Sequence, residues 1–439
     1  MEMWMLENRK HYIYFLSFAI WLPGELTFIS SLSCSSRLSS LIGTLITGQL
    51  DDGRGLSRSK IMIHKHEMES GRTSTISSHL LGYDMDSKPI FTHSNNGTKK
   101  EGIKTDADVA AKAASLVSLM DLAGHEKYLK TTIHGISSGM IEYSLVLVNA
   151  NHPPTHMTRH HINISVACGI PIIIVLTKVD RCPAHVLKST KDEISAIIRS
   201  PEVNKKIYQV KKDFDISIVQ NKLHAITPII SISCVTGQGI DLVHMLLSSL
   251  PKRRRHHQKI NRSFEFLVDK VFNVTGVGTV VSGFVNAGHL VLGQKAFLGP
   301  YANGKFIQSQ IKSMHIASAH VNSIIAGNTA CLGLTLSKDE KRLVRKGMTV
   351  FEHPVETSVA FEAEMTILRG KGVDGTTIRP DYETMVHVLH IKQHARIETI
   401  EVIGDAYGGL GMDLDADDNI IRPGSRAKIK FRFLQQKVK

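Results

Sequence analysis

The sequence predicts a doubly wound α/β domain in the first half of the chain and two small β-rich domains in the second half. The first observation behind this is a set of short apolar runs rich in β-branched residues, at 144–148, 170–176 and 228–232. Such runs are typical of strands buried on both faces of a parallel sheet. The second is that helical stretches separate these runs, and the third is that helical periodicity fades after about residue 263.

The helical stretches lie at residues 160–168, 188–199 and 242–250. Alternation of strands and helices predicts a parallel sheet covered by helices, because each parallel pair needs a crossover connection. Pro251 and the charged residues after it then break the pattern, as a linker does.

Short strands separated by glycines follow the linker. The first block has them at 264–268, 278–281, 290–292, 305–315 and 349–351, and the second at 361–368, 384–390, 395–402 and 427–434. Many short strands with glycine between them are typical of a β-barrel or sandwich. We therefore expect two β domains.

Composition narrows the class of protein. The 439 residues correspond to about three domains at roughly 150 residues each. A hydrophobic content of 42% excludes disorder as the main state. The five cysteines are far apart and form no CxxC pair, which excludes a disulfide scaffold and a structural zinc site. The net charge of +13 favours a polyanionic partner such as nucleic acid.

An apolar run at residues 12–22 precedes the α/β domain. It is too short for a bilayer-spanning helix, which takes about 18 or more apolar residues. It could be the apolar core of a secretory signal, with the small residues at 30–36 as the cleavage zone. The lack of paired cysteines counts against secretion. We favour the interpretation that residues 1–36 are an atypical segment introduced by a misassigned gene start.

The linker at residues 252–262 opens with the basic run Lys-Arg-Arg-Arg-His-His at 252–257. Such a run is typical of a nuclear localisation signal or an RNA-phosphate patch. It is equally typical of a solvated linker, and both interpretations stay open here.

The first chemical motif is Asp121-Leu-Ala-Gly124-His125, directly after a strand-like run at 115–120. A carboxylate at a strand end can hold Mg²⁺, and a glycine three residues later lets a backbone N–H approach a phosphate closely. A DxxG string alone also arises by chance, and Asp121 could instead cap the following helix.

Two further motifs end predicted strands: Thr177-Lys178-Val-Asp180 follows 170–176, and Ser233-Cys234 follows 228–232. Ligands of open α/β sheets bind beyond the carboxyl ends of the strands. The Asp180 carboxylate can accept the ring N–H and the exocyclic amine of guanine, while the Lys178 stem covers the base. Backbone N–H groups at Ser233-Cys234 can donate to the guanine carbonyl. The three motifs in this order indicate a guanine-nucleotide site.

Together these residues resemble the translational GTPase superfamily of the elongation factor Tu type, and within it the eukaryotic GTP-binding protein one/two subfamily. The resemblance covers about residues 39 to 434. The strings that carry it are GRG at 53–55, HKHE at 64–67, ESGRTS at 69–74, DLAGHEKYLKTT at 121–132, TKVDRCPA at 177–184 and GVGTVVSG at 276–283, with KSMH at 312–315, AG at 326–327 and RKGM at 345–348.

The resemblance implies a fold and domain boundaries. It implies a P-loop-type GTPase domain at 37–251, the basic linker, and two β-barrel domains of the elongation factor Tu type at 263–356 and 357–439. The family's third domain runs on past a strand like 428–433. We therefore expect the last barrel to be incomplete at its C-terminal end.

The resemblance also implies the roles of individual residues. His125 matches the histidine that orients the attacking water and is the expected catalytic residue. Mg²⁺ would be held by Ser39, Thr73 and Asp121. The expected nucleotide-binding residues are Ser39, Thr73, Asp121, Gly124, Thr177, Lys178, Asp180, Ser233 and Cys234.

The phosphate loop departs from the family. A P-loop uses glycines to wrap backbone N–H groups around phosphates and a lysine to reach the β- and γ-phosphates. Here Leu38 stands at the lysine position, and Arg37 and Leu32 stand at the glycine positions, while only Ser39 is retained. Residues 26–31 could still form the first strand. Either the gene start is misassigned, which we favour, or the chain is a pseudo-GTPase.

The expected function is that of a GTP-binding protein and GTPase of the translation elongation factor type, a GTP-driven switch acting with RNA or ribosomes. The alternative is a pseudo-GTPase that serves as an RNA- or protein-binding scaffold, and the missing glycines and lysine put the activity of the chain in doubt. The cofactors would be GTP or GDP and Mg²⁺. We expect a cytoplasmic monomer whose partners are guanine nucleotide and RNA such as tRNA, and neither DNA nor a membrane.

Overall fold

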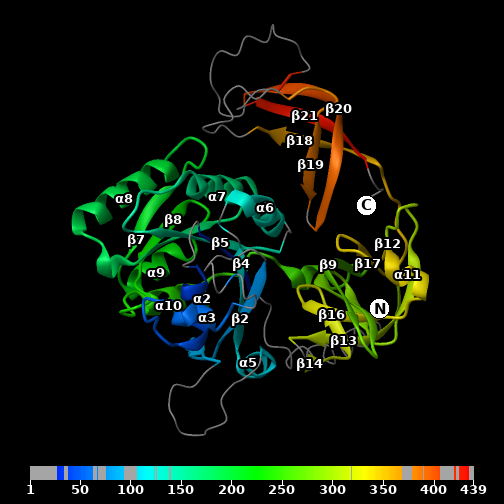
Figure 1. Ribbon diagram of the computed structural model, residues 1–439, viewed down its shortest axis with the longest axis horizontal. Helices are drawn as coiled ribbons and strands as arrows, with labels where there is room; N and C mark the ends of the chain where they lie inside the picture. The colour runs from blue at the N-terminus through cyan, green and yellow to red at the C-terminus, as the bar shows by residue number, and fades with distance from the viewer. Residues whose placement is uncertain are drawn as a thin grey trace, which may run out of the picture.

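The chain folds into three successive units, an α/β domain, a barrel and a smaller sheet (Figure 1). The computed structural model describes residues 27–33, 38–62, 67, 76–92, 106–122, 124, 126–137, 140–317, 319–367, 378–388, 390–405, 420–421 and 425–434. No helix in these ranges is both long and apolar enough to cross a membrane. The predicted apolar run at 12–22 lies outside them.

One eight-stranded sheet organises the α/β domain, in the order β3-β2-β4-β1-β5-β6-β8-β7. The pairs from β4 to β7 are parallel, as predicted, because each connection crosses over through a helix. The strands are β1(Thr27–Ser33), β2(Ser77–Tyr83), β3(Pro89–Ile90), β4(Ser115–Leu122), β5(Tyr143–Asn149), β6(Ile172–Thr177), β7(Lys206–Val210) and β8(Ile226–Ser231).

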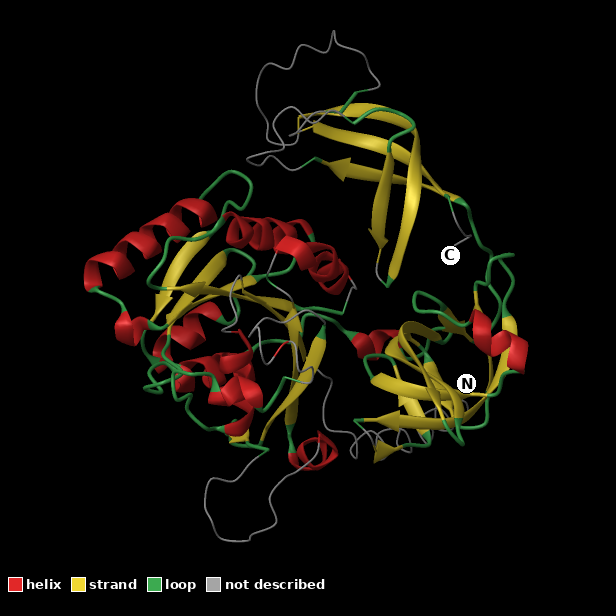
Figure 2. Cartoon of the chain, viewed as in Figure 1, coloured by secondary structure: helices red, strands yellow, loops and turns green. Residues whose placement is uncertain are grey.

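Helices cover both faces of this sheet (Figure 2). One apolar cluster joins the sheet to α2, α9 and α10, and the other joins it to α6, α7 and α8. The helices are α2(Leu38–Thr47), α3(Leu56–Ser59), α5(Asp106–Lys112), α6(Leu129–Ser137), α7(His156–Ala167), α8(Ala184–Ile198), α9(Asp213–Val219) and α10(Ile240–Ser249), with the short 3₁₀ turns η1(Glu126–Tyr128) and η2(Val179–Arg181). The doubly wound α/β class is therefore confirmed.

The second unit is a closed barrel. The order β12-β17-β9-β10-β16-β13 returns to β12 through a further pairing of β12 with β13. Closure leaves the apolar side chains of these strands in one interior cluster, which includes Phe266, Val281 and Met314. The strands of this unit are β9(Glu265–Val274), β10(Gly278–Ala287), β11(His289–Val291), β12(Lys295–Gly299), β13(Ile307–Ile316), β14(Ala319–His320), β15(Ser323–Ile325), β16(Thr329–Leu334) and β17(Thr349–Phe351), and the exposed helix α11(Lys338–Leu343) connects β16 to β17.

The third unit is an antiparallel sheet in the order β18-β21-β20-β19. Its strands are β18(Ala360–Thr366), β19(Glu383–Val388), β20(Ile391–Asp405) and β21(Ser425–Phe433). Alternation along β21 places Phe431 and Phe433 on an apolar face, where Phe361 stacks on both. Lys428 and Arg432 lie on the other face, in ion pairs with neighbouring glutamates. A period of two residues in the sequence therefore separates the core of this unit from its charged surface.

Part of the basic linker is bound to the α/β domain. The buried Glu142 carboxylate accepts the backbone N–H of Arg253 at 2.7 Å and that of Arg254 at 3.4 Å. The Arg253 guanidinium donates to the carbonyl oxygens of Glu142 and Gly169 at 2.9 and 3.1 Å, and it lies 6.0 Å from the centroid of the Tyr143 ring. Burial raises the pKa of Glu142 despite these donors. The linker backbone is therefore anchored at Arg253 and Arg254, while Lys252 and Arg255 beside them are exposed.

A histidine within the linker packs where the barrel meets the α/β domain. His256 begins the 3₁₀ turn η3(His256–Lys259) and is buried, with its ring edge-on to Phe284 at a centroid distance of 5.5 Å. Phe284 comes from β10 of the barrel, yet it belongs to the apolar cluster between the α/β sheet and α6, α7 and α8. The α/β domain and the barrel are thus joined by an apolar contact as well as by the covalent chain.

Replacing Glu142 by alanine is expected to release the linker, because the two N–H groups of Arg253 and Arg254 lose their charged acceptor. A charge-assisted hydrogen bond contributes about 1.5–3 kcal/mol, so cleavage by trypsin at residues 252–255 should accelerate about ten-fold or more. The measurement is a time course of limited trypsin digestion. Glu142→Gln, which keeps a carbonyl acceptor, is the control and should stay nearer to the unmodified chain. Equal cleavage rates in all three chains would contradict this account of the linker.

Candidate guanine-nucleotide site

A cavity of about 220 Å³ lies beyond the carboxyl ends of β6 and β8. This is the edge at which ligands of open α/β sheets bind. The cavity is lined by residues from the start of α2, the loop before α3, α3 itself, the end of β6 and the segments after β6 and β8: Ser40, Asp51, Gly53, Arg54, Gly55, Arg58, Thr177, Lys178, Asp180, Arg181, Ser233, Cys234 and Val235. The two predicted strand-end motifs therefore meet at one cavity.

The segment after β6 holds the Asp180 carboxylate at the cavity. Thr177 is buried at the end of the strand, where its hydroxyl donates to the Val148 carbonyl oxygen at 3.3 Å. Lys178 has a left-handed backbone with φ of 62°, which turns the chain into η2. Such a conformation is costly for a residue with a side chain, and its use at a ligand site is common. The Asp180 carboxylate lies 3.7 Å from Nε of Arg181.

The loop after β8 closes on itself through Ser233. The Ser233 hydroxyl accepts the N–H groups of Val235 and Thr236 at 3.3 and 3.2 Å. The Ser233 N–H donates to the Gln238 carbonyl oxygen at 2.9 Å, so it is not available to a ligand, and this part of the sequence prediction is corrected. Within the described residues the Cys234 N–H has no acceptor. Burial raises the pKa of the Cys234 thiol to about 11, so this side chain lines the cavity as an uncharged group.

The loop between α2 and α3 completes the cavity, and sequence reasoning missed its role. The Asp51 N–H donates to the Cys234 carbonyl oxygen at 2.9 Å, which brings this loop to the segment after β8. The Asp52 carboxylate accepts three consecutive N–H groups, those of Arg54, Gly55 and Leu56, and these bonds lower the pKa of Asp52. The GRG string at 53–55 was the available signal.

The expected phosphate end of the site contains one defined contact. Ser39, in the first turn of α2, donates its hydroxyl hydrogen to the Asp121 carboxylate at 3.0 Å, and both side chains are buried. Asp121 lies within β4, so it does not cap a helix, and Gly124 is buried just beyond the strand. A hydroxyl and a carboxylate in contact are oxygen ligands of the kind Mg²⁺ prefers. The donor set of the described residues therefore fits this ion.

The region of the absent phosphate loop is shorter than the sequence suggested. β1 lies between β4 and β5, and its pairing extends to Leu32 and Ser33, beyond the predicted strand at 26–31. Leu32 therefore belongs to a strand, where it pairs with β4 and β5, and Leu38 is the first residue of a helix. Residues 34–37, which include Arg37, lie outside the described residues, as do Thr73 and His125.

Comparison with known proteins agrees with this geometry. Residues 39–252 match the family model of the elongation factor Tu GTP-binding domain. This part of the chain is therefore a GTP-binding domain of the elongation factor Tu type, and the whole chain is similar in sequence to GTP-binding proteins 1 and 2.

Two groups of relatives lie near it by sequence. GTP-binding protein 1 of Xenopus laevis is 34% identical over 401 residues, which are 90% of this chain and 57% of that protein. GTP-binding protein 2 of Homo sapiens is 30% identical over 408 residues, which are 91% of this chain and 63% of that protein. The chain therefore spans 57–63% of the length of these relatives.

Solved structures show the same fold at low identity. The GTPase-like domain of S. cerevisiae Ski7, bound to GTP, superposes with a TM-score of 0.67 at 12% identity, over 96% of this chain and 93% of that one. A bacterial selenocysteine-specific elongation factor superposes with a TM-score of 0.61 at 18% identity, over 94% of this chain and 54% of that one. The expected order of a GTPase-type α/β domain followed by β-barrel domains is confirmed.

Proposed function

We propose that the cavity between the segments after β6 and β8 binds the guanine base, and that the chain is a GTP-driven switch. The observation that carries the proposal is the convergence of Lys178, Asp180 and Cys234 on one cavity, next to the Ser39–Asp121 contact. α2 connects the two, because Ser40 lines the cavity and Ser39 bonds to Asp121. A base and a phosphate tail could therefore be held by one continuous surface.

Base recognition would rest on complementary donors and acceptors. The Asp180 carboxylate offers two acceptor oxygens to the two neighbouring N–H groups of guanine, and the Cys234 N–H is the donor for its carbonyl oxygen. Adenine presents the opposite pattern at these positions, so it would leave both protein groups unpaired. Because an unpaired buried polar group costs about 1–3 kcal/mol, the arrangement selects guanine.

The phosphates would lie at the N-terminal end of α2, where backbone N–H groups point outward and the helix dipole favours an anion. Ser39 and Asp121 would hold Mg²⁺, with Thr73 as a further ligand. When bound, this ion would neutralise phosphate charge. The protein's own part is to position the nucleotide and, through His125, a water molecule.

The proposed cellular role is a GTP-dependent step with RNA or ribosomes in the cytoplasm. Relatives include proteins named selenocysteine-specific elongation factor, of which one from Escherichia coli is 25% identical over 262 residues. The net charge of +13 supports an RNA partner. The two β units that follow the α/β domain would present the RNA-binding surface.

A second candidate is a scaffold that binds partners without hydrolysing GTP. The observation that favours it is the absence of glycine and lysine from residues 32–38. Phosphate release from GTP distinguishes the two candidates. It is measured for the chain itself and for a chain in which residues 32–38 are replaced by a GxxxxGK loop, with ATP as control. Release that is specific for GTP in the repaired chain supports the switch, and no release from either chain supports the scaffold.

His125→Ala in the repaired chain is expected to lower GTP turnover by about ten-fold or more and leave GTP affinity within a few-fold. An orienting group acts in the transition state, where such groups are worth about 10²–10⁴ in rate. Single-turnover hydrolysis and a GTP titration separate the two effects. His185→Ala, on the exposed start of α8, is the control. Lost affinity with unchanged turnover would make His125 a binding or structural residue.

A further inference from the structure

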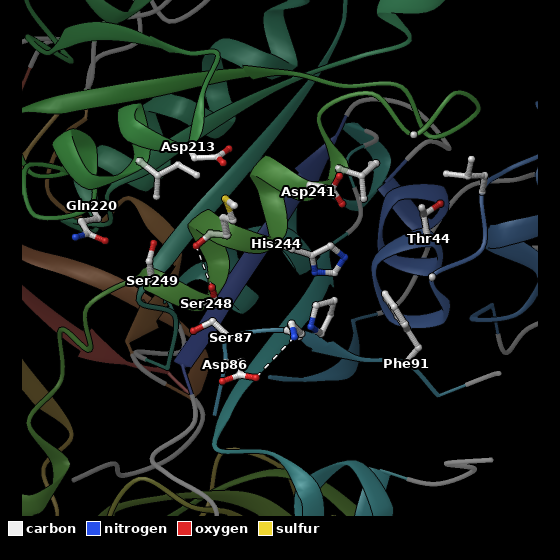
Figure 3. A pocket seen from close by; sticks show the side chains of 18 of the residues that line it. Thr44, Asp86, Ser87, Phe91, Asp213, Gln220, Asp241, His244, Ser248 and Ser249 are labelled. Atoms are coloured by element: carbon white, nitrogen blue, oxygen red, sulfur yellow. Dashed lines mark hydrogen bonds and ion pairs between the residues drawn. The ribbon is translucent and has the colours of Figure 1, made fainter. Parts of the chain in front are cut away.

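A second and larger cavity is lined in part by Thr236 and Gly237 of the loop that follows β8. Figure 3 shows side chains that line it. Its volume is about 830 Å³, within the range of about 300–1,000 Å³ typical of ligand sites. It is bounded by α2, the turn between β2 and β3, α9 and α10. We call it the α9–α10 groove. None of the residues expected to bind nucleotide lines it.

The groove is acidic, although the chain as a whole is basic. Asp86, Asp213 and Asp241 line it, and Lys88 is the one lysine or arginine among the described lining residues. Lys88 lies 3.7 Å from the Asp86 carboxylate, which offsets its charge. Asp213 and Asp241 make no ion pair within the described part of the chain. In a chain of net charge +13, this concentration of carboxylates favours a cationic occupant.

The groove also exposes large apolar side chains. Leu50, Phe91 and Met245 line it and are 46%, 38% and 39% exposed. His244 lies among the lining residues, where Tyr83 bonds to its ring at 3.3 Å and the Phe91 ring meets it edge-on. Burial lowers the pKa of His244 to about 4, so it brings no positive charge at neutral pH. The occupant must therefore supply both apolar and cationic groups.

We propose that the α9–α10 groove binds a short segment of a partner protein whose apolar side chains are flanked by lysine or arginine. Apolar side chains would cover Leu50, Phe91 and Met245, as in helix-in-groove recognition. The flanking cations would lie against Asp213, the first residue of α9, and Asp241, in the first turn of α10, which are both labelled in Figure 3.

The groove and the guanine cavity share a wall. Leu50 lines the groove and Asp51 lines the cavity, while Thr236 and Gly237 line the groove and Cys234 lines the cavity. The Asp51 N–H donates to the Cys234 carbonyl oxygen at 2.9 Å, so the loop between α2 and α3 is hydrogen-bonded to the segment after β8. A side chain in the groove would therefore touch the same wall that holds the base.

A second contact passes through this wall from α2. Thr44 lines the groove, and its hydroxyl donates to the carbonyl oxygen of Ser40, which lines the cavity, at 2.9 Å. The coupling that follows, which rests on the proposed function, is that an occupied groove immobilises the loop after β8 and slows release of a guanine nucleotide. By linkage, the factor by which the bound segment raises the equilibrium affinity for nucleotide is also the factor by which bound nucleotide raises the affinity for the segment.

Binding is tested on the full chain by fluorescence anisotropy with a labelled twelve-residue amphipathic peptide of leucine and lysine. Its counterpart of leucine and glutamate has the same apolar face. The lysine peptide is expected to bind at least ten-fold more tightly than the glutamate peptide. The double variant Asp213→Asn, Asp241→Asn should lose at least five-fold in affinity for it. The double variant Asp192→Asn, Asp339→Asn, whose two residues are exposed and do not line the groove, is the matched control. Equal binding of both peptides, or equal loss in the control, overturns the proposal.

Coupling is tested separately in the chain that carries the GxxxxGK loop, by release of fluorescent mant-GDP. Saturating lysine peptide is expected to slow release at least three-fold, and not in the double aspartate variant. If mant-GDP does not bind, the proposed function fails, while the anisotropy result on the groove stands by itself. If mant-GDP binds and its release is unchanged by bound peptide, the coupling is wrong.

Discussion

Asp180→Asn is expected to reverse the base preference of the site from guanine to xanthine. Xanthine carries a carbonyl where guanine carries its exocyclic amine, and an asparagine amide can donate to that carbonyl. The mutation should lower guanine-nucleotide affinity by about 100-fold, because two charge-assisted hydrogen bonds of about 1.5–3 kcal/mol each are weakened. Xanthine-nucleotide affinity should rise.

The measurement is a competition titration of GTP and XTP in the chain that carries the GxxxxGK loop. Asp192→Asn, on the exposed side of α8, changes the charge equally and should leave the preference unaltered. A mutant that keeps the original preference for guanine would show that the carboxylate near Arg181 does not read the base.

Replacing residues 32–38 by a GxxxxGK loop is expected to raise GTP affinity by about 100-fold or more. Leu38 offers no cation to the phosphates, and a lost charge-assisted bond costs about 1.5–3 kcal/mol. Leu32 and Arg37 also disfavour the positive φ that aims successive N–H groups at an anion, so further donors are lost. The chain itself should then bind GTP near the millimolar range, since each 1.4 kcal/mol is about ten-fold.

Calorimetric titration of GTP with Mg²⁺ into both chains measures this difference. A replacement of the same length with alternating glycine and serine but no lysine is the control, and it should recover only part of the gain. Micromolar binding by the unmodified chain would instead mean that its own residues around β1 and α2 form a competent phosphate site.

Much of the α/β domain could be predicted because its central strands are continuous apolar runs. The runs at 144–148, 170–176 and 228–232 became β5, β6 and β8, each extended or shifted by two residues at most. The antiparallel edge was not predicted. β2 reads SSHLLGY, whose mixed polar and apolar residues carry no clear period, and its pairing with β4 is decided by tertiary contact.

The candidate site could be predicted only in part. A motif at a strand end can be located from the sequence, since the carboxyl edge of a parallel sheet is where ligands bind. The sequence does not show which backbone groups remain available to a ligand. The Ser233 N–H, for example, donates to the Gln238 carbonyl oxygen. The contribution of the loop at 51–55 depends on a bond from Asp51 to Cys234, far along the chain. The α9–α10 groove likewise exists only through contacts between distant segments.

Ligand-observed NMR of GTP and ATP with the unmodified full chain tests the central claim most directly, because it detects binding in the millimolar range. The account predicts saturation transfer to the guanine H8 proton of GTP, little transfer to the adenine protons of ATP, and loss of the GTP signal in Asp180→Asn. Equal transfer to both nucleotides, or a GTP signal that survives the Asp180 substitution unchanged, would contradict the assignment of this cavity to guanine.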